Sequence, residues 1–239
     1  MPGRKLSQHT KRLAARIMPT SVLQAQLHRR TIMQFAERIG MVYFGYVDQR
    51  HDEHSLVRGL TLSPTHRDNN YCVGSYEDYD VTLVERSDTI KQPGKSAKSY
   101  QWLIMTFDLH AVVDLPHVFV GLHSVDETFY SHVFTKFSRL AMVPLGTLGQ
   151  HGQAFLSRYT IYAPPEQALS TERLFRPEIT KVIGEQFGSL MCEINDGTLY
   201  LYGQYMNPTS RSLETMLQLG HWLARALDTG ITANENSAV

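Results

Sequence analysis

The hydrophobic residues of this chain change their spacing after residue 40, and this change limits the possible folds more than any other feature. Before that point they recur every three or four positions, as they do along one face of a helix. From Met41 on, β-branched and aromatic residues alternate with polar ones, in short runs between clusters of Gly, Pro, Asn and Asp. The sequence therefore predicts an α+β protein, with a helical start and a body made mainly of antiparallel β-sheet.

Two turn signals indicate hairpins within that body. The stronger is Asp196-Gly197, which lies between predicted strands within residues 190–205. An Asp-Gly pair is typical of the tight turn that joins two antiparallel strands. The weaker signal, at residues 77–78, separates two predicted strands within residues 71–84. Each hairpin falls in a different half of the body, so we predict a sheet built from two hairpin-rich halves.

A connection rich in glycine separates the two halves. Residues 144–152 contain one proline and three glycines, which is typical of a loop. We therefore divide the chain into a basic helical arm at 1–40, a first half at about 41–143 and a second half at about 153–230. The second half is predicted to open with a strand at 154–162.

Helices are predicted at three places in the body. Residues 127–140 and a segment from Pro177 to Gly188 have helical signals, and residues 210–228 carry a continuous apolar stripe. We expect the last helix to pack on the sheet and to end at Gly230. Residues 231–239 are polar and are predicted to form a disordered tail.

The arm at 1–40 is strongly cationic. Its first 36 residues contain seven Lys or Arg and no Asp or Glu, which leaves 16 basic and 23 acidic side chains in the remainder. A cationic segment is attracted to the phosphates of lipids or nucleic acids, whereas the acidic body is not. The predicted binding residues are therefore Arg4, Lys5, Lys11, Arg12, Arg16, Arg29 and Arg30.

The arm should form two helices, at about 7–18 and from about 21 to Gly40, separated by Pro19. The apolar residues of the first helix include no Trp or Phe, so it would support only reversible contact with an anionic membrane. An acidic protein partner and nucleic acid are the alternatives for the same residues.

The cytoplasm is the compartment that the sequence favours. The longest apolar runs, at 41–47 and 102–107, are far shorter than the ~20 residues of a membrane-spanning helix. The N-terminus lacks the continuous apolar stretch of a secretion signal. The two cysteines, Cys72 and Cys192, are too few for a disulfide framework or a zinc site, and we predict unpaired strand cysteines. Peripheral association would then occur at the inner face of a membrane.

One cluster of possible metal ligands occurs in a segment predicted to be a solvated loop. His51 and His54 flank two carboxylates, and His66 follows. Imidazole and carboxylate are ligands of zinc and manganese, so a metal-dependent hydrolase is an alternative function. The spacing does not match an H-E-x-x-H helix, and the solvated loop is the favoured interpretation.

No other pattern indicates catalysis. The chain has no G-x-S-x-G motif, and Ser124 with its neighbours His123 and Asp126 is interpreted as an exposed loop. The three glycines at 146, 149 and 152 lack the context of a phosphate-binding loop, so no cofactor is predicted. Tyr200 and Tyr202 share one sheet face, and we expect them to pack beneath a loop or helix rather than to stack on a ligand.

Residues from about 33 to 228 resemble an uncharacterised family of bacterial domains of unknown function. The similarity rests on the phrases at 34–45, 70–76, 80–86, 115–117, 158–163 and 196–202. The resemblance implies an α+β domain working beside the inner face of a membrane, and it implies no catalytic residues. Many relatives have membrane-spanning helices before the domain, where this chain has its basic arm.

These observations favour a non-enzymatic binding or scaffolding module that the arm recruits to an anionic membrane surface or an acidic partner. The alternatives are a nucleic-acid-binding protein that uses the same arm and a hydrolase at the histidine cluster.

Overall fold

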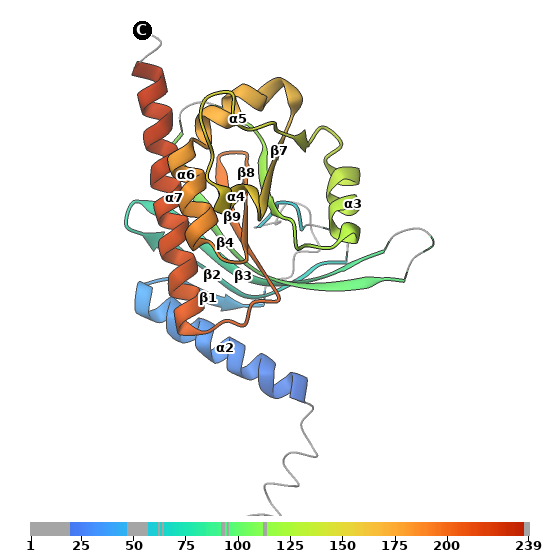
Figure 1. The fold of residues 1–239 in the computed structure, drawn as a ribbon. Helices are drawn as coiled ribbons and strands as arrows, with labels where there is room; N and C mark the ends of the chain where they lie inside the picture. The colour runs from blue at the N-terminus through green and yellow to red at the C-terminus, as the bar shows by residue number, and fades with distance from the viewer. Residues whose placement is uncertain are drawn as a thin grey trace, which may run out of the picture.

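The α+β class and the antiparallel sheet are confirmed by the computed structural model (Figure 1). It describes residues 20–46, 57–61, 63, 65–91, 94, 96–111 and 114–236. Within these residues nine strands form one sheet, every neighbouring pair is antiparallel, and helices cover both faces.

Strands from both predicted halves are interleaved in this sheet. Their order is β1-β2-β3-β4-β9-β8-β5-β7-β6. The strands are β1 (Val42–Gly45), β2 (Arg67–Tyr76), β3 (Tyr79–Ile90), β4 (Lys98–Asp108), β5 (Val118–Leu122), β6 (Ala141–Met142), β7 (Tyr159–Ala163), β8 (Leu190–Asn195) and β9 (Thr198–Gln204). Because β5 lies between β8 and β7, residues before and after the glycine-rich connection share one sheet and one core.

Both predicted hairpins are present. At the β8–β9 turn, Asp196 and Gly197 have φ angles of 49° and 73°, so both central residues adopt the left-handed conformation of a type I′ turn. At the β2–β3 turn, Glu77 has a φ of 49°. The turn chemistry of the sequence thus places these strands correctly.

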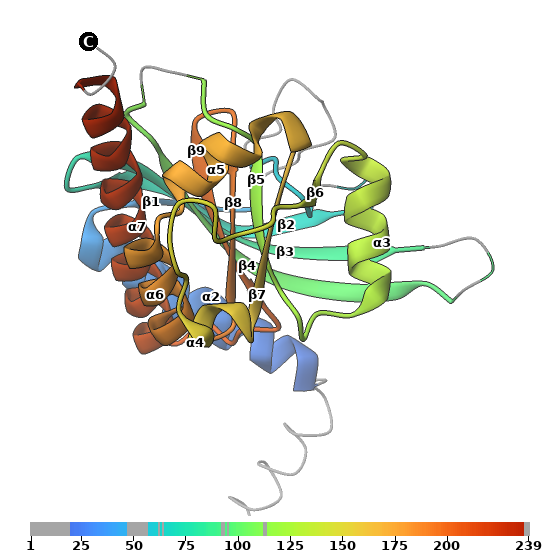
Figure 2. The same cartoon turned by 45° about the horizontal axis from the view of Figure 1, so that its top comes forward.

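The helices lie on opposite faces of the curved sheet. They are α2 (Thr20–Ile39), α3 (Glu127–Lys136), α4 (Gln153–Leu156), α5 (Ala168–Leu174), α6 (Pro177–Gln186) and α7 (Ser210–Asn236), with a short 3-10 turn, η2 (Pro165–Gln167). Helices α4, α6 and α7 lie on one side of β7, β8 and β9, and α3 lies on the other (Figures 1 and 2). Helix α2 lies across β1 and β2 and also contacts α7.

Helix α7 packs on the sheet, as predicted. A Cβ atom on Gly220 would lie 2.1 Å from Cε2 of Phe107 in β4, so only glycine permits this close approach. The predicted end of the helix at Gly230 is wrong, since α7 continues to Asn236. A single glycine costs a helix only about 1 kcal/mol relative to alanine, which is too little to end a helix that the body supports.

The predicted strand at 154–162 is half wrong, because residues 153–156 form the single turn α4 and the strand begins at Tyr159. The cause is a long-range contact. Gly184 of α6 lies so close to α4 that an added Cβ would be 2.5 Å from the Phe155 nitrogen. The alternating pattern of residues 154–162 contains no sign of this packing.

Helix α2 confirms the second arm helix. Ile32, Phe35 and Ala36 are fully buried against the sheet. The helix ends at Gly40, whose φ is 80°, and the Met41 N–H donates to the Ala36 carbonyl at 2.8 Å, as expected for a glycine stop. The first predicted helix, at 7–18, lies outside the described residues.

A segment that the sequence leaves as loop is part of the core. Val57, Leu60 and Thr61 are buried on the face opposite α2 and α7. Arg86, itself 1% exposed, forms a two-point ion pair with Asp68 and donates from Nη2 to the Val57 carbonyl at 2.6 Å. A buried arginine needs such acceptors for all its N–H groups, so residues 57–61 and the sheet stabilise each other.

Cys72 and Cys192 are buried, unpaired strand residues, as predicted. Burial raises the pKa of the Cys72 thiol to about 12, so this residue is unreactive at neutral pH. Among the helices that the structure describes, none combines the length and the hydrophobicity required to cross a membrane.

Candidate functional site

Two of the seven predicted arm residues lie in α2, and both are exposed. Arg29 and Arg30 are consecutive residues on a part of the helix surface that is not buried in the core. The other five, Arg4, Lys5, Lys11, Arg12 and Arg16, lie outside the described residues. The structure therefore describes the root of the predicted binding arm but not its first helix.

The charges of Arg29 and Arg30 are not neutralised within the described part of the chain. Neither forms an ion pair with a described carboxylate, whereas Arg38, two turns further along α2, pairs with Glu214 of α7 at 2.6 Å. Arg29 instead lies beside Tyr43. Burial raises the pKa of Tyr43, and the charge of Arg29 opposes this shift. Both guanidinium groups remain available to an external anion.

A groove of about 860 Å³ runs between α2, strands β1 to β4 and residues 205–207. Three hydrogen bonds cross its floor. The Tyr43 hydroxyl donates to Oδ1 of Asn70 at 2.6 Å, Nδ2 of Asn70 donates to Glu85, and Nδ1 of His28 lies 2.8 Å from Oε1 of Glu85. These bonds join α2 to three neighbouring strands, so they hold Arg29 in a defined place over the sheet.

Asn70 is central to this network because β2 bulges there. The pairing of β2 with β3 shifts register between Asn69 and Cys72, and Asn70 has a φ of 54°. A bulge with a left-handed residue redirects the side chain that it carries, and asparagine tolerates this conformation. Nothing in the alternating pattern of the strand signals the bulge, so the sequence alone does not indicate Asn70, Glu85 and His28 as site residues.

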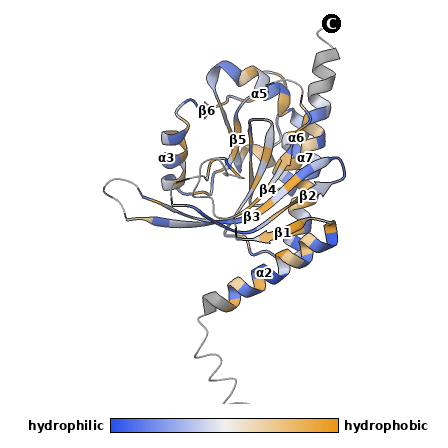
Figure 3. Ribbon diagram, turned by 180° about the vertical axis from the view of Figure 1, so that it is seen from behind, coloured by the Kyte–Doolittle hydropathy of each residue, from blue (hydrophilic) through white to orange (hydrophobic). Residues whose placement is uncertain are grey.

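Large apolar side chains are exposed beside the two arginines. Leu27 of α2 is 65% exposed, Phe44 of β1 is 55% exposed, and Tyr46 is 62% exposed. Figure 3 shows hydrophobic and hydrophilic residues mixed along α2. Single exposed apolar residues are ordinary, but a group of them at one edge marks an interaction surface. We call Leu23, Leu27, Arg29, Arg30, Phe44 and Tyr46 the α2 surface.

The predicted metal cluster gains no support from the described residues. His51 and His54 lie outside them, and Nδ1 of His66 bonds the Ser63 carbonyl oxygen. Within the part of the chain that the structure describes, no three His, Cys, Asp or Glu residues come close enough to hold a metal. The hydrolase alternative therefore stays a prediction from the sequence.

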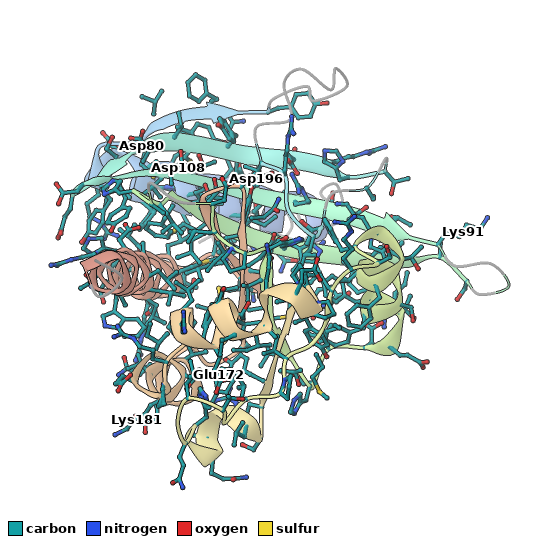
Figure 4. All side chains as sticks on the ribbon, turned by 90° about the horizontal axis from the view of Figure 1, so that it is seen from above. Asp80, Lys91, Asp108, Glu172, Lys181 and Asp196 are labelled. Atoms are coloured by element: carbon teal, nitrogen blue, oxygen red, sulfur yellow. The ribbon has the colours of Figure 1, made fainter. Side chains whose placement is uncertain are left out.

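The glycine-rich connection does surround an anionic group, but the group is the protein's own. The backbone N–H groups of Gly146 and Leu148 donate to Oε1 of Glu172 at 2.8 Å and 2.9 Å (Glu172 is labelled in Figure 4). Burial acts to raise the pKa of Glu172, but these backbone hydrogen bonds outweigh it and the net pKa is lowered. The loop therefore serves the fold, in keeping with the interpretation as a connection.

Two further interpretations are confirmed. Asp126 does not join His123 and Ser124 in a triad, because it caps α3 through the Phe129 N–H and accepts from the Tyr100 hydroxyl. Tyr200 and Tyr202 pack beneath residues 57–61, as expected for structural tyrosines.

Comparisons with known proteins relate the chain to others by fold. No protein-family model matches the chain, so the resemblance to a bacterial family stays a prediction. No curated protein matches its sequence. Among solved structures, it is similar to the crystal structure of the mycobacterial trehalose monomycolate transport factor A, TtfA, with a TM-score of 0.54 and 12% sequence identity. The match covers 85% of this chain and 94% of that chain. At this identity the similarity shows a shared fold and nothing more.

Proposed function

We propose that this chain is a non-enzymatic binding module that attaches to an anionic membrane surface through its basic arm and the α2 surface. The observation that carries the proposal is that Arg29 and Arg30 are exposed and have no ion-pair partner in the described residues. Leu27 of the same helix is exposed too, as are Phe44 and Tyr46, which line one groove together with Arg29. Cytoplasmic location, at the inner face of a membrane, belongs to the same proposal.

Both the arginines and the apolar side chains of the α2 surface are needed for such an attachment. Each Lys or Arg near an anionic membrane contributes on the order of 1 kcal/mol, and apolar side chains that enter the interface add a second contribution. The first arm helix has no aromatic residue, but the fold places Phe44 of β1 and Tyr46, just after it, in one groove with Arg29. An aromatic ring with one polar end is suited to the membrane–water interface.

The structural neighbour is compatible with this proposal. TtfA is named as a transport factor for trehalose monomycolate and not for a reaction that it catalyses. A protein of that description would need to bind and position, which is what we propose for this chain. The exposed charges and apolar side chains of α2 support the proposal independently of this similarity.

Sedimentation with vesicles tests the proposal. The full chain should bind vesicles of phosphatidylglycerol and phosphatidylcholine and should not bind phosphatidylcholine alone. In the variant Arg29→Gln/Arg30→Gln, we expect about 30-fold weaker partitioning, because two charges of on the order of 1 kcal/mol each are removed. Increasing salt should weaken binding of the wild type, since salt screens exposed charges.

The matched control is Arg173→Gln/Lys181→Gln, which removes the same net charge from exposed positions of α5 and α6. Lys181 lies across the molecule from β2 and β3 (Figure 4). Equal loss of binding in both double variants would show that only net charge matters and would contradict the proposal. Failure to bind anionic vesicles at low salt, together with tight binding to duplex DNA, would replace it with the nucleic-acid alternative.

A further inference from the structure

A second pocket lies at the other end of β9 from the groove beneath α2. The groove is lined by residues 205–207, which follow β9, and the second pocket by residues 195–197, which precede it. Its volume is about 820 Å³, within the range of about 300–1,000 Å³ that is usual for small-molecule sites. We call it the His117 pocket, after the one imidazole in its lining.

The imidazole that lines this pocket bonds a buried carboxylate, that of Glu193. The side chain of Glu193 is fully buried, and its Oε2 accepts from the Tyr202 hydroxyl at 2.5 Å and from the Leu60 N–H at 2.9 Å. Burial raises the pKa of Tyr202 well above its ordinary value, and the charge of Glu193 adds to this shift, so the tyrosine keeps its proton. Oε1 of Glu193 is left for a third partner.

That partner is His117. Its Nε2 lies 2.7 Å from Oε1 of Glu193, although the two residues are 76 positions apart in the chain. Because the carboxylate can only accept, Nε2 carries the proton, and in neutral His117 the lone pair is on Nδ1. The His117 side chain is 18% exposed, and no described residue bonds Nδ1. The structure thus fixes the tautomer of His117 and leaves one acceptor open to the pocket.

The rim of the pocket combines both signs of charge. Lys136 and Arg139, at the end of α3, supply donors, and Asp114, Glu166 and Asp196 supply carboxylate acceptors. Asp196 is labelled at the β8–β9 turn in Figure 4. The two basic side chains would repel a cationic ligand, and the three carboxylates would repel an anionic one. A hydroxyl group both donates and accepts, so a ligand rich in hydroxyls can satisfy both sets without a net charge.

We propose that the His117 pocket binds a small uncharged ligand with several hydroxyl groups, a sugar or a cyclic polyol, and that Nδ1 of His117 accepts a hydrogen bond from one of them. This site is independent of the α2 surface.

Ligand-observed saturation-transfer NMR on the full chain tests the proposal. The neutral probes are glucose, sucrose and myo-inositol, and the charged probes are inorganic phosphate and putrescine. We expect at least one neutral probe to bind and to compete with the others, and neither charged probe to bind as tightly. Tighter binding of phosphate or putrescine than of every neutral probe would overturn the proposal, and so would the absence of binding by all of them.

Two variants connect binding to the pocket. In His117→Gln, the amide can still donate to Glu193 while the imidazole Nδ1 is absent, and we expect about ten-fold weaker binding from the loss of one hydrogen bond. Asp114→Ala removes an exposed rim carboxylate and should have a similar effect whether or not the first variant folds. The matched control is Asp78→Ala, in the exposed β2–β3 turn. Equal affinity in the wild type and Asp114→Ala, or equal loss in Asp78→Ala and Asp114→Ala, would contradict the proposal.

Discussion

The α2 surface and the buried charged residues that bond residues 57–61 show two opposite ways of treating charge. At the α2 surface, Arg29 and Arg30 are exposed and form no ion pair with a described carboxylate. Beneath residues 57–61, Arg86 and Glu193 are about 1% exposed, and both are surrounded by hydrogen-bonding partners. A charge in water needs no partner, whereas a buried charge is tolerated only when it is paired and hydrogen-bonded.

This contrast separates residues that support the fold from residues that are free to bind something else. Removing a partner of Arg86 or Glu193 leaves a buried charge unsatisfied, so such changes should reduce the free energy of unfolding. Removing a side chain of the α2 surface leaves nothing unsatisfied inside the protein, so such changes should affect binding alone. The following predictions test that separation.

The largest effect is expected for Arg86→Met. The substitution leaves Asp68 buried without its guanidinium partner and frees the carbonyl of Val57. We expect the free energy of unfolding to fall by about 3–5 kcal/mol, measured by urea denaturation. Arg67→Met, at an exposed position of the neighbouring strand, should change it by less than about 0.5 kcal/mol. A small loss in Arg86→Met would show that residues 57–61 are not held as described.

A smaller loss is expected for Tyr202→Phe. Without the hydroxyl, the buried Glu193 carboxylate loses one of its donors. We expect the free energy of unfolding to fall by about 1–3 kcal/mol, the usual cost of an unsatisfied buried polar group. The control is Tyr205→Phe, which removes an exposed hydroxyl that donates to the Ser99 carbonyl. Comparable losses in the two variants would contradict the special role assigned to Glu193.

The third prediction concerns pH. The Nζ of Lys136 donates to the Gly59 carbonyl at 2.9 Å. Burial lowers the pKa of this lysine to about 8. The charges of Glu193 and Asp88 act to raise this pKa, and the charge of Arg86 acts to lower it. Between the folded pKa of about 8 and the ordinary value of 10.5, the unfolded chain binds more protons than the folded chain. The titration of Lys136 therefore makes the free energy of unfolding rise with pH in this window.

Lys136→Met should remove this contribution. From pH 8 to pH 10, the free energy of unfolding should rise more, or fall less, in the wild type than in the variant. Because Lys136 is exposed as a whole residue, solvent screens the effect, and we expect less than about 1 kcal/mol. Above pH 10.0, buried tyrosines with raised pKa values make the folded state less stable as pH rises. The measurement therefore ends at pH 10. A constant difference across this window would show that Lys136 titrates normally.

The smallest effect on stability is expected for Leu27→Ser/Phe44→Ser. Both side chains are more than half exposed, so the free energy of unfolding should change by no more than about 0.5 kcal/mol. Partitioning onto anionic vesicles should still fall, because the apolar contribution at the interface is lost. Unchanged partitioning would reduce the proposed attachment to electrostatics. A large loss of stability would instead place these residues in the fold.

The sequence predicted the local elements well because their causes are local. Alternation placed the strands, the Asp196-Gly197 pair placed the β8–β9 turn, and Gly40 ended α2. The expectation that Tyr200 and Tyr202 pack beneath another segment also followed from strand parity. At 154–162 the prediction failed because a contact between distant segments overrode the local pattern, and at Gly230 because one glycine costs too little to end a helix.

The candidate site could be predicted only in part. The excess of basic residues at the start of the chain identified Arg29 and Arg30 without any structure. The exposed Phe44 and Tyr46 were not expected at that site, because their position beside α2 depends on how β1 and α2 meet. The hydrogen bonds of Asn70 depend on a bulge that leaves no mark in the composition of the strand.

The sequence by itself determined the main helices, strands and turns, and where its positive charge lies, because periodicity, turn chemistry and composition act over a few residues. Only the tertiary structure decided which side chains meet. His117 reaches Glu193 because β5 pairs with β8, and residues 57–61 are buried because Arg86 offers them hydrogen bonds. Strand order and register arise from pairing between distant parts of the chain, and no short stretch of sequence contains that information.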